Sequence, residues 1–161
     1  LADGNPEETG IFYGQNAAGI NTCFMLHHTK TLGDLGILKA QIDLFQQGFI
    51  VAIPLTEHAP FDLMIYKDGR SRTVQVKARS IDSKGRINIS FKSTYSDSRG
   101  MHIKPVDKSH IDLYCVYCPE TDECYYFEPA HFRRSVSLRV NTPKNNQKKG
   151  VNFAYDYRQV P

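Results

Sequence analysis

The amino-acid sequence predicts an α+β fold in which one long amphipathic helix packs on a mixed or antiparallel sheet. One observation is a set of apolar residues that recurs at helical spacing between residues 32 and 48. Another is a series of short apolar segments, separated by turn signals, from residue 49 to residue 140. The 161 residues suffice for one domain with a core that needs no disulfide staples, and the four cysteines do not look like a disulfide framework.

The helix is predicted to begin near Leu32 and to end before Gly48, since glycine commonly follows the last helical turn. Asp34 stands at its expected start, where an acidic side chain can cap the helix or act in its first turn. Residues three and four apart lie on the same helix face. The apolar residues with this spacing, which predict the amphipathic face, are Leu35, Leu38, Ile42 and Phe45.

The strands that follow are predicted from short apolar segments bounded by turn residues. Asp68-Gly69 is typical of a two-residue hairpin turn and joins two of these strands. A turn over residues 82–85 leads to the next strand, so a meander is expected from Asp62 to Phe91. The predicted strands cover residues 49–53, 62–66, 72–77 and 86–91.

The second half of the chain is expected to complete the sheet. Residues 93–109 are polar and irregular, which is typical of a mobile loop. Strands over residues 111–117 and 124–127 form a second predicted hairpin. A short helix after Pro129 and an alternating strand over residues 135–140 follow.

The first 31 residues differ from the rest of the chain. They are rich in Gly, Asn and Thr, and they show neither a sustained helical nor an alternating period. We expect residues 1–31 to be an extension outside a domain formed by residues 32–161. Read-through from a non-standard upstream start codon and an unrelated appended segment are both compatible with it.

Positive charge is concentrated near the middle of the chain. The formal net charge is +3, but the segment from Lys67 to Lys108 holds eleven Lys or Arg against four Asp. A basic block of this kind favours a polyanionic partner, and a solvated surface with scattered lysines is the alternative. No segment approaches the apolar length of a membrane span, and residues 1–30 lack a secretory signal pattern. A cytoplasmic protein without a membrane partner is the simplest interpretation.

One pair of predicted strands carries a candidate site. Asp62 follows Pro60-Phe61, and in the next strand Gln75 and Lys77 share a face because side chains alternate along a strand. Asp62 could lie beside them across the strand pair. The alternative is a strand-end acid that solubilises a turn and an outward-facing lysine on an edge strand.

These groups suit metal-dependent cleavage of a phosphodiester. Mg²⁺ prefers oxygen ligands, and Asp62 supplies a carboxylate. The Gln75 side-chain oxygen or the Val76 carbonyl could supply further ligands. Lys77 could hold the attacking water or neutralise the charge that develops in the transition state.

The same segments resemble a known family. Gly33-Asp34-Leu35-Gly36, the run GFIVAIPLTEHAPFDLMIY and the run TVQVKARS closely resemble the PD-(D/E)XK nuclease superfamily. Within it they are similar to the branch of cyanobacterial group I intron-encoded (tRNA intron) homing endonucleases, and so are DLYCVYCPETDECYYF and TPKNNQKK. The resemblance spans residue 32 to the C-terminus.

The resemblance implies a restriction-endonuclease-like core and a sequence-specific endonuclease that cuts both strands of DNA. It implies Mg²⁺ as the cofactor, with Mn²⁺ as a substitute, and catalysis by Asp62, Gln75 and Lys77. Gln75 stands where other branches carry the middle acid of the motif. A restriction enzyme or a junction resolvase on the same core is the nearest alternative, and a catalytically decayed DNA-binding module is the other.

One position departs from the family pattern. Such enzymes often carry a metal-binding Glu on the first helix, which aligns near Ile37, where this chain has no carboxylate. Asp34 lies one turn earlier on roughly the same face and could replace it, or it could act only at the helix start. If no other acid reaches the metal, Asp62 is the sole carboxylate.

Basic residues near the motif are the predicted phosphate contacts: Arg72, Arg79, Lys84, Arg86 and Lys92. Residues 91–104 are expected to contribute side chains that read bases. Two copies of a small active site are needed to cut both strands, so a homo-oligomer, either a dimer or a tetramer, is expected.

The cysteines tempt a zinc assignment that the spacing does not favour. Cys115 and Cys118 have opposite parity along a predicted strand, so their side chains face opposite ways. We therefore expect core cysteines and no zinc site.

Overall fold

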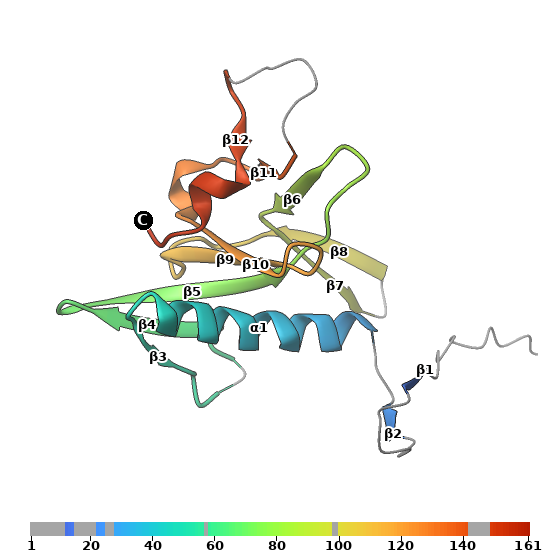
Figure 1. Ribbon diagram of the computed structural model, residues 1–161, viewed down its shortest axis with the longest axis horizontal. Helices are drawn as coiled ribbons and strands as arrows, with labels where there is room; N and C mark the ends of the chain where they lie inside the picture. The colour runs from blue at the N-terminus through green and yellow to red at the C-terminus, as the bar shows by residue number, and fades with distance from the viewer. Residues whose placement is uncertain (1–11, 15–21, 25–27, 57, 98–99, 142–148) are drawn as a thin grey trace, which may run out of the picture.

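The computed structural model describes residues 12–14, 22–24, 28–56, 58–97, 100–141 and 149–161. Within these residues, the fold is α+β and has three layers: the helix α1, a mixed central sheet and a smaller sheet (Figure 1). The predicted fold class is confirmed. Among the same residues, no helix combines the length and the apolar character that crossing a membrane requires.

The central sheet holds most of the predicted strands. Its order is β10-β9-β5-β4-β3, and all neighbouring strands are antiparallel except β5 and β9, which are parallel. The turn between β4 and β5 is the predicted hairpin, with positive φ at Asp68 and Gly69. The strand bounds are β3 Ile50–Ala52, β4 Leu63–Lys67, β5 Arg70–Ala78, β9 Leu113–Cys118 and β10 Glu123–Phe127.

The predicted meander from Asp62 to Phe91 is wrong. The strand β6 (Arg86–Ser90) does not pair with β5; it leaves the central sheet and pairs with β11 (Ser135–Arg139). Its place beside β5 is taken by β9, which comes from much later in the chain. Burial explains the exchange. Continuous burial of β9 on both faces suits an inner position, whereas β6 alternates between buried and exposed residues.

The smaller sheet covers the face of the central sheet that is opposite α1. It consists of β6, β11 and the short β12 (Asn152–Phe153), and the 3₁₀ helix η2 (Ala154–Tyr157) follows it. Apolar side chains of both sheets form one core, in which Tyr114 stacks on Phe127. A short 3₁₀ helix, η1 (Pro129–His131), stands where the sequence predicts a short helix.

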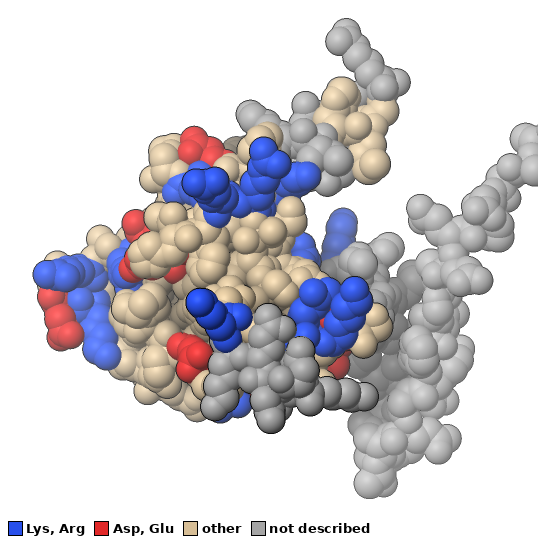
Figure 2. All heavy atoms as spheres, turned by 90° about the horizontal axis from the view of Figure 1, so that it is seen from above, with Lys and Arg blue, Asp and Glu red and all other residues tan. Residues whose placement is uncertain are grey.

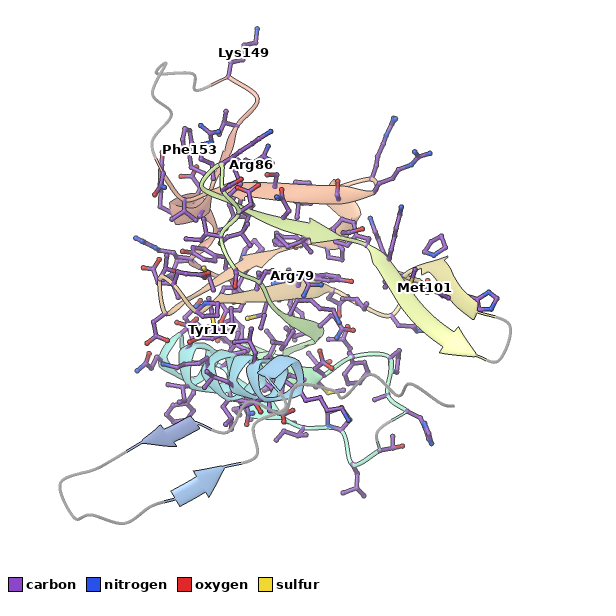
Figure 3. The ribbon with its side chains drawn as sticks, turned by 90° about the vertical axis from the view of Figure 1, so that its right-hand side faces the viewer. Arg79, Arg86, Met101, Tyr117, Lys149 and Phe153 are labelled. Atoms are coloured by element: carbon purple, nitrogen blue, oxygen red, sulfur yellow. The ribbon has the colours of Figure 1, made fainter. Side chains whose placement is uncertain are left out.

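The structure corrects the predicted loop over residues 93–109. Two strands, β7 (Lys92–Asp97) and β8 (Gly100–Pro105), pair over six residues and form an antiparallel ribbon. Figure 3 shows this ribbon projecting from the body of the protein, with Met101 on its outer part. The absence of apolar periodicity here reflects a ribbon that packs mainly on itself, so neither strand needs a buried face.

The helix α1 spans His28–Gln46 and begins four residues before its predicted start. Asp34 consequently lies in the second turn and is exposed, so the expected capping or first-turn role is wrong. Two further strands, β1 (Phe12–Gly14) and β2 (Thr22–Phe24), pair with each other before the helix.

The helix packs on the sheet with a different face from the one that predicts it. Gly36, Ala40 and Leu44 are buried against β5 and β9. The residues whose spacing predicts the helix (Leu35, Leu38, Ile42 and Phe45) are all exposed, by 38%, 57%, 57% and 74%. Small side chains let the helix come close to the sheet, and a Cβ added at Gly36 would lie 3.4 Å from that of Ala78. Closeness of approach therefore decides the packing face.

The cysteines lie in the core as expected. Cys115, Cys118 and Cys124 are buried and free. Cys115 faces the core beneath α1 and Cys118 faces the opposite core, in agreement with their opposite parity.

A pair of substitutions at Gly36 tests the packing of the helix. Gly36→Ala should raise the free energy of unfolding by up to about 1 kcal/mol, because alanine favours the helix and its Cβ makes ordinary contacts here. Gly36→Leu should lower it by about 1–3 kcal/mol, because the longer side chain must push α1 away from Ala78. Chemical denaturation measures both, and equal stability of the two variants would contradict this packing.

Candidate active site

The carboxylate of Asp62 lies at the point where β4 and β5 separate. Asp62 directly precedes β4, and its backbone N–H donates to the Val74 carbonyl at 2.9 Å. One carboxylate oxygen, Oδ2, accepts the Val76 backbone N–H at 2.7 Å and a hydrogen bond from the Gln75 side-chain amide. The half-buried carboxylate is thus held against β5 by two donors.

Alternation along β5 places the two polar residues of the motif on one face. Val74 and Val76 are buried on the side of α1, so Gln75 and Lys77 point to the other side of the sheet. The structure therefore brings Gln75 into direct contact with Asp62 and puts Lys77 on the same face, as the spacing predicts. Within the described part of the chain, no carboxylate forms an ion pair with Lys77.

Oxygen atoms suited to a hard cation gather beside Asp62. The N–H of Val76 faces Asp62, and the N–H and C=O of a strand residue point to the same side, so the Val76 carbonyl also faces the site. The second carboxylate oxygen, Oδ1, accepts no hydrogen bond from a described residue. Carboxylate, carbonyl and amide oxygens fit Mg²⁺. Among the described residues, no three His, Cys, Asp or Glu side chains gather in a way that could hold a metal ion.

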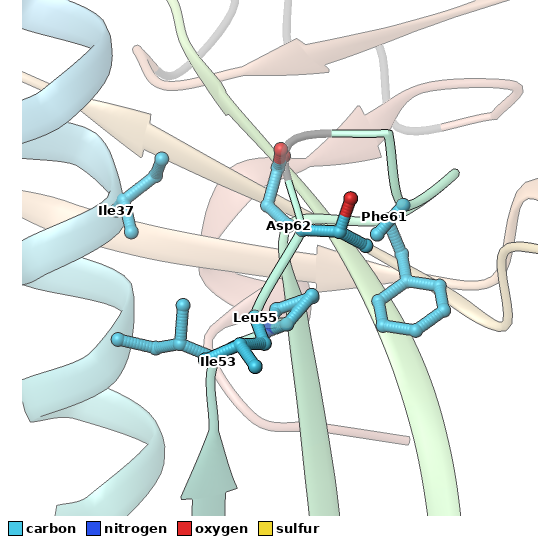
Figure 4. Close-up of a pocket in the computed structure, with 8 residues that line it drawn as sticks. Ile37, Ile53, Leu55, Phe61 and Asp62 are labelled. Atoms are coloured by element: carbon cyan, nitrogen blue, oxygen red, sulfur yellow. The ribbon is translucent and has the colours of Figure 1, made fainter.

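A pocket of about 330 Å³ opens next to Asp62 (Figure 4). Its other walls are apolar and come from α1, from Phe61 and from the loop that follows β3; Ile37 contributes from the helix. Ile37 therefore occupies the place at which the family pattern leads us to expect a helix Glu. Asp34, one turn earlier, is exposed and does not line this pocket. Its assignment to the metal stays a prediction.

The predicted phosphate contacts fall into two groups. Arg72 and Arg86 already have partners, because Arg72 binds the Glu128 carboxylate at 2.6 Å and Arg86 binds Asp82. The Arg86 guanidinium helps to lower the pKa of Asp82 to about 2. The other three, Arg79, Lys84 and Lys92, are exposed.

The exposed cations have room to meet a ligand. In Figure 3, Arg79 lies between Arg86 in the smaller sheet and Tyr117 in the central sheet. On the face seen in Figure 2, Lys and Arg side chains form several groups, and acidic side chains occupy less of the surface. This distribution suits a long polyanion better than a small acidic ligand.

Tyr114 belongs to the site, although the sequence does not point to it. In the parallel pairing of β5 and β9, Tyr114 lies opposite Gln75, and the Phe91 ring packs edge-on against its ring. Burial raises the pKa of the Tyr114 phenol, and the negative charge of Asp62 raises it further. Only the pairing of β5 with β9, which the predicted meander excludes, reveals this neighbour.

The coupling between Asp62 and Tyr114 can be measured by titration. Asp62→Asn should lower the pKa of Tyr114, because it removes a charge that opposes the phenolate. NMR of ¹³Cζ-labelled tyrosine, with Tyr114→Phe for assignment, follows the titration. Asp156→Asn is the matched control, since its charge acts on Tyr157 and should leave Tyr114 unchanged. An unaltered Tyr114 titration in Asp62→Asn would refute the coupling.

Comparisons with known proteins agree with this geometry. The family model described as PD-(D/E)XK endonuclease matches residues 27–160. The solved structure of the bacterial homing endonuclease I-Ssp6803I is similar, with a TM-score of 0.67 and 24% sequence identity. The similarity covers 81% of this chain and 88% of that one. No curated protein matches the sequence. Because the family model covers most of the chain, this protein belongs to the PD-(D/E)XK endonuclease family.

Proposed function

We propose that this DNA endonuclease is a homing-type enzyme that makes sequence-specific double-strand breaks by Mg²⁺-dependent hydrolysis of phosphodiesters. The observation that carries the proposal is the meeting of Asp62 and Gln75 at one end of β4 and β5, with Lys77 on the same face. The similarity of the fold to a protein named as a bacterial homing endonuclease supports it. We propose that residues 32–161 form the nuclease domain and that residues 1–31 are an extension.

The metal ligands are Asp62, the Val76 carbonyl and Gln75. When bound, Mg²⁺ supplies a Lewis acid that polarises the scissile phosphate and acidifies the attacking water. Gln75 now turns its amide nitrogen to Asp62. Rotation of that amide would present its oxygen to the site instead and release a carboxylate lone pair.

Lys77 acts on the phosphate and on the water. Its ammonium group lies on the face of Gln75, where no described carboxylate neutralises it. A point cation here can orient the water and stabilise the negative charge that grows on the phosphate in the transition state. The carboxylate of Asp62 is the nearest base on the same face and can accept a hydrogen bond from that water.

DNA would be held by exposed cations and read by the β7–β8 ribbon. Arg79, Lys84 and Lys92 are free to contact phosphates, whereas Arg72 and Arg86 would have to leave Glu128 and Asp82 to do so. A two-stranded ribbon fits the major groove, where the base edges are distinguishable. We therefore place the base-reading segment on β7 and β8, in a homo-oligomer with two such ribbons.

The decayed DNA-binding module is the second candidate, because Ile37 stands where a helix Glu would join the metal. Incubation with long duplexes, with a four-way junction and with Mg²⁺ or EDTA separates the candidates. Preference for one duplex site favours a homing enzyme or restriction enzyme, preference for the junction favours a resolvase, and binding without cleavage favours the decayed module.

Single substitutions test the catalytic assignment. Lys77→Ala and Asp62→Ala should each lower the cleavage rate at least 100-fold, because they remove transition-state charge stabilisation and the metal carboxylate. Arg70→Ala, in the remote β4–β5 hairpin, is the matched control and should cut like the parent. Gel assays with a target-bearing plasmid provide the rates, and parental rates in both site variants would overturn the assignment.

Metal binding can be tested without DNA. Mg²⁺ should raise the melting temperature of the parent but not that of Asp62→Asn. Gln75→Glu should tighten Mg²⁺ binding about 10-fold, because a second carboxylate faces Asp62 and the two repel each other without metal. Calorimetry and thermal melts measure both effects. Weaker Mg²⁺ binding by Gln75→Glu than by the parent would exclude Gln75 as a ligand.

A further inference from the structure

The outer side of α1 and the segment after it expose a continuous apolar surface. We call it the outer apolar face, and its members range from 38% exposed at Leu35 to 106% at Leu55. A hollow joins the helix to β3, with Ile42, Phe45 and Ile50 among its walls. The outer apolar face comprises Leu35, Leu38, Ile42, Phe45, Ile50, Ile53 and Leu55.

This surface has no role in packing the chain that the structure describes. The helix is attached to the sheet by its other side, through Gly36, Ala40 and Leu44. The strand β3 is the last strand of the central sheet, so Ile50 stands at its edge. Seven large apolar side chains exposed on one side of a protein exceed what most monomers show, which indicates a contact surface.

The area suits a stable contact between proteins. With about 200 Å² for each fully exposed large side chain, the exposed fractions amount to roughly 900 Å². A standard interface buries roughly 800 Å² on each partner. The area is therefore sufficient for an oligomer without any further surface.

The charges on α1 leave this face neutral. Lys39 turns to Asp122, and the Asp43 carboxylate accepts the Tyr126 hydroxyl at 2.6 Å, so both charges are held on the sheet side. The polar neighbours within the hollow are the amides of Gln41 and Gln46, which both donate and accept hydrogen bonds. Two copies of such a face can meet without juxtaposing like charges, whereas a DNA phosphate would find no cation there.

We propose that the outer apolar face is the contact between two copies of this chain, related by a two-fold axis, with α1 packed on the partner's α1. A two-fold axis brings the same patch together with itself. Gln75 and Lys77 project from the opposite face of the central sheet, so the contact leaves the active site open to DNA. The inference rests on the proposed function only in its reason for two copies, which is the cutting of two strands.

The molecular mass of the DNA-free protein tests the contact. The parent should be a dimer or tetramer by light scattering and sedimentation at micromolar concentration. Phe45→Glu and Ile42→Glu should each raise the dissociation constant at least 10-fold, because they bury a charge at the centre of the contact. Met101→Glu is the matched control: Met101 is 71% exposed, close to the 74% of Phe45, and its substitution should leave the mass unchanged.

Folding and occupancy by another part of the chain need their own readouts. Circular dichroism checks each variant, and the milder Phe45→Gln replaces Phe45→Glu if the latter unfolds. A monomeric parent, or glutamate variants with the parental mass, would overturn the proposal. A monomeric parent whose melting temperature falls in Phe45→Glu would instead assign the face to residues 1–27.

Plasmid cleavage separates this inference from the proposed function. If both are correct, Phe45→Glu should nick the target while double-strand cutting falls at least 10-fold. Association without Mg²⁺-dependent cleavage would refute the proposed function and leave the contact intact. Cleavage by a parent whose mass the glutamate variants retain would refute the contact and leave the function intact.

Discussion

The parallel pairing of β5 with β9 is the interaction on which the rest of the structure depends. It places Val74 opposite Leu113 and Ala78 opposite Tyr117, so β5 has a partner on each side. Both faces of the sheet are then covered near β9, by α1 and by the smaller sheet. Only the free end of β4 leaves part of β5 accessible, and the active site lies there.

The close approach of α1 follows from the same sheet. A flat apolar surface from β5 and β9 can be met by small residues, and Gly36 and Ala40 let the backbone lie close to it. Larger residues would fill the same space only at a greater distance and with fewer contacts. The bulky stripe of Leu38, Ile42 and Phe45 therefore turns outward, where a second protein surface can use it.

The active site combines a fixed carboxylate with an adaptable amide. Asp62 is anchored by backbone groups of β5, whereas Gln75 can offer either its nitrogen or its oxygen. With Ile37 in the adjoining pocket, the charge of Asp62 is the negative charge of this site that the described side chains supply. The backbone carbonyl of Val76 and the amide of Gln75 thus carry more of the metal binding than in a site with two carboxylates.

The sequence by itself determined the local structure and the chemistry. The Asp68-Gly69 turn, the alternation through Gln75 and Lys77, and the position of Asp62 are encoded within a few neighbouring residues, so their geometry follows from strand periodicity and turn preferences. Only the tertiary structure decided which strand lies beside β5, which face of α1 is buried and that Tyr114 joins the site. These depend on contacts between distant segments, where two apolar alternatives compete and the better packing prevails.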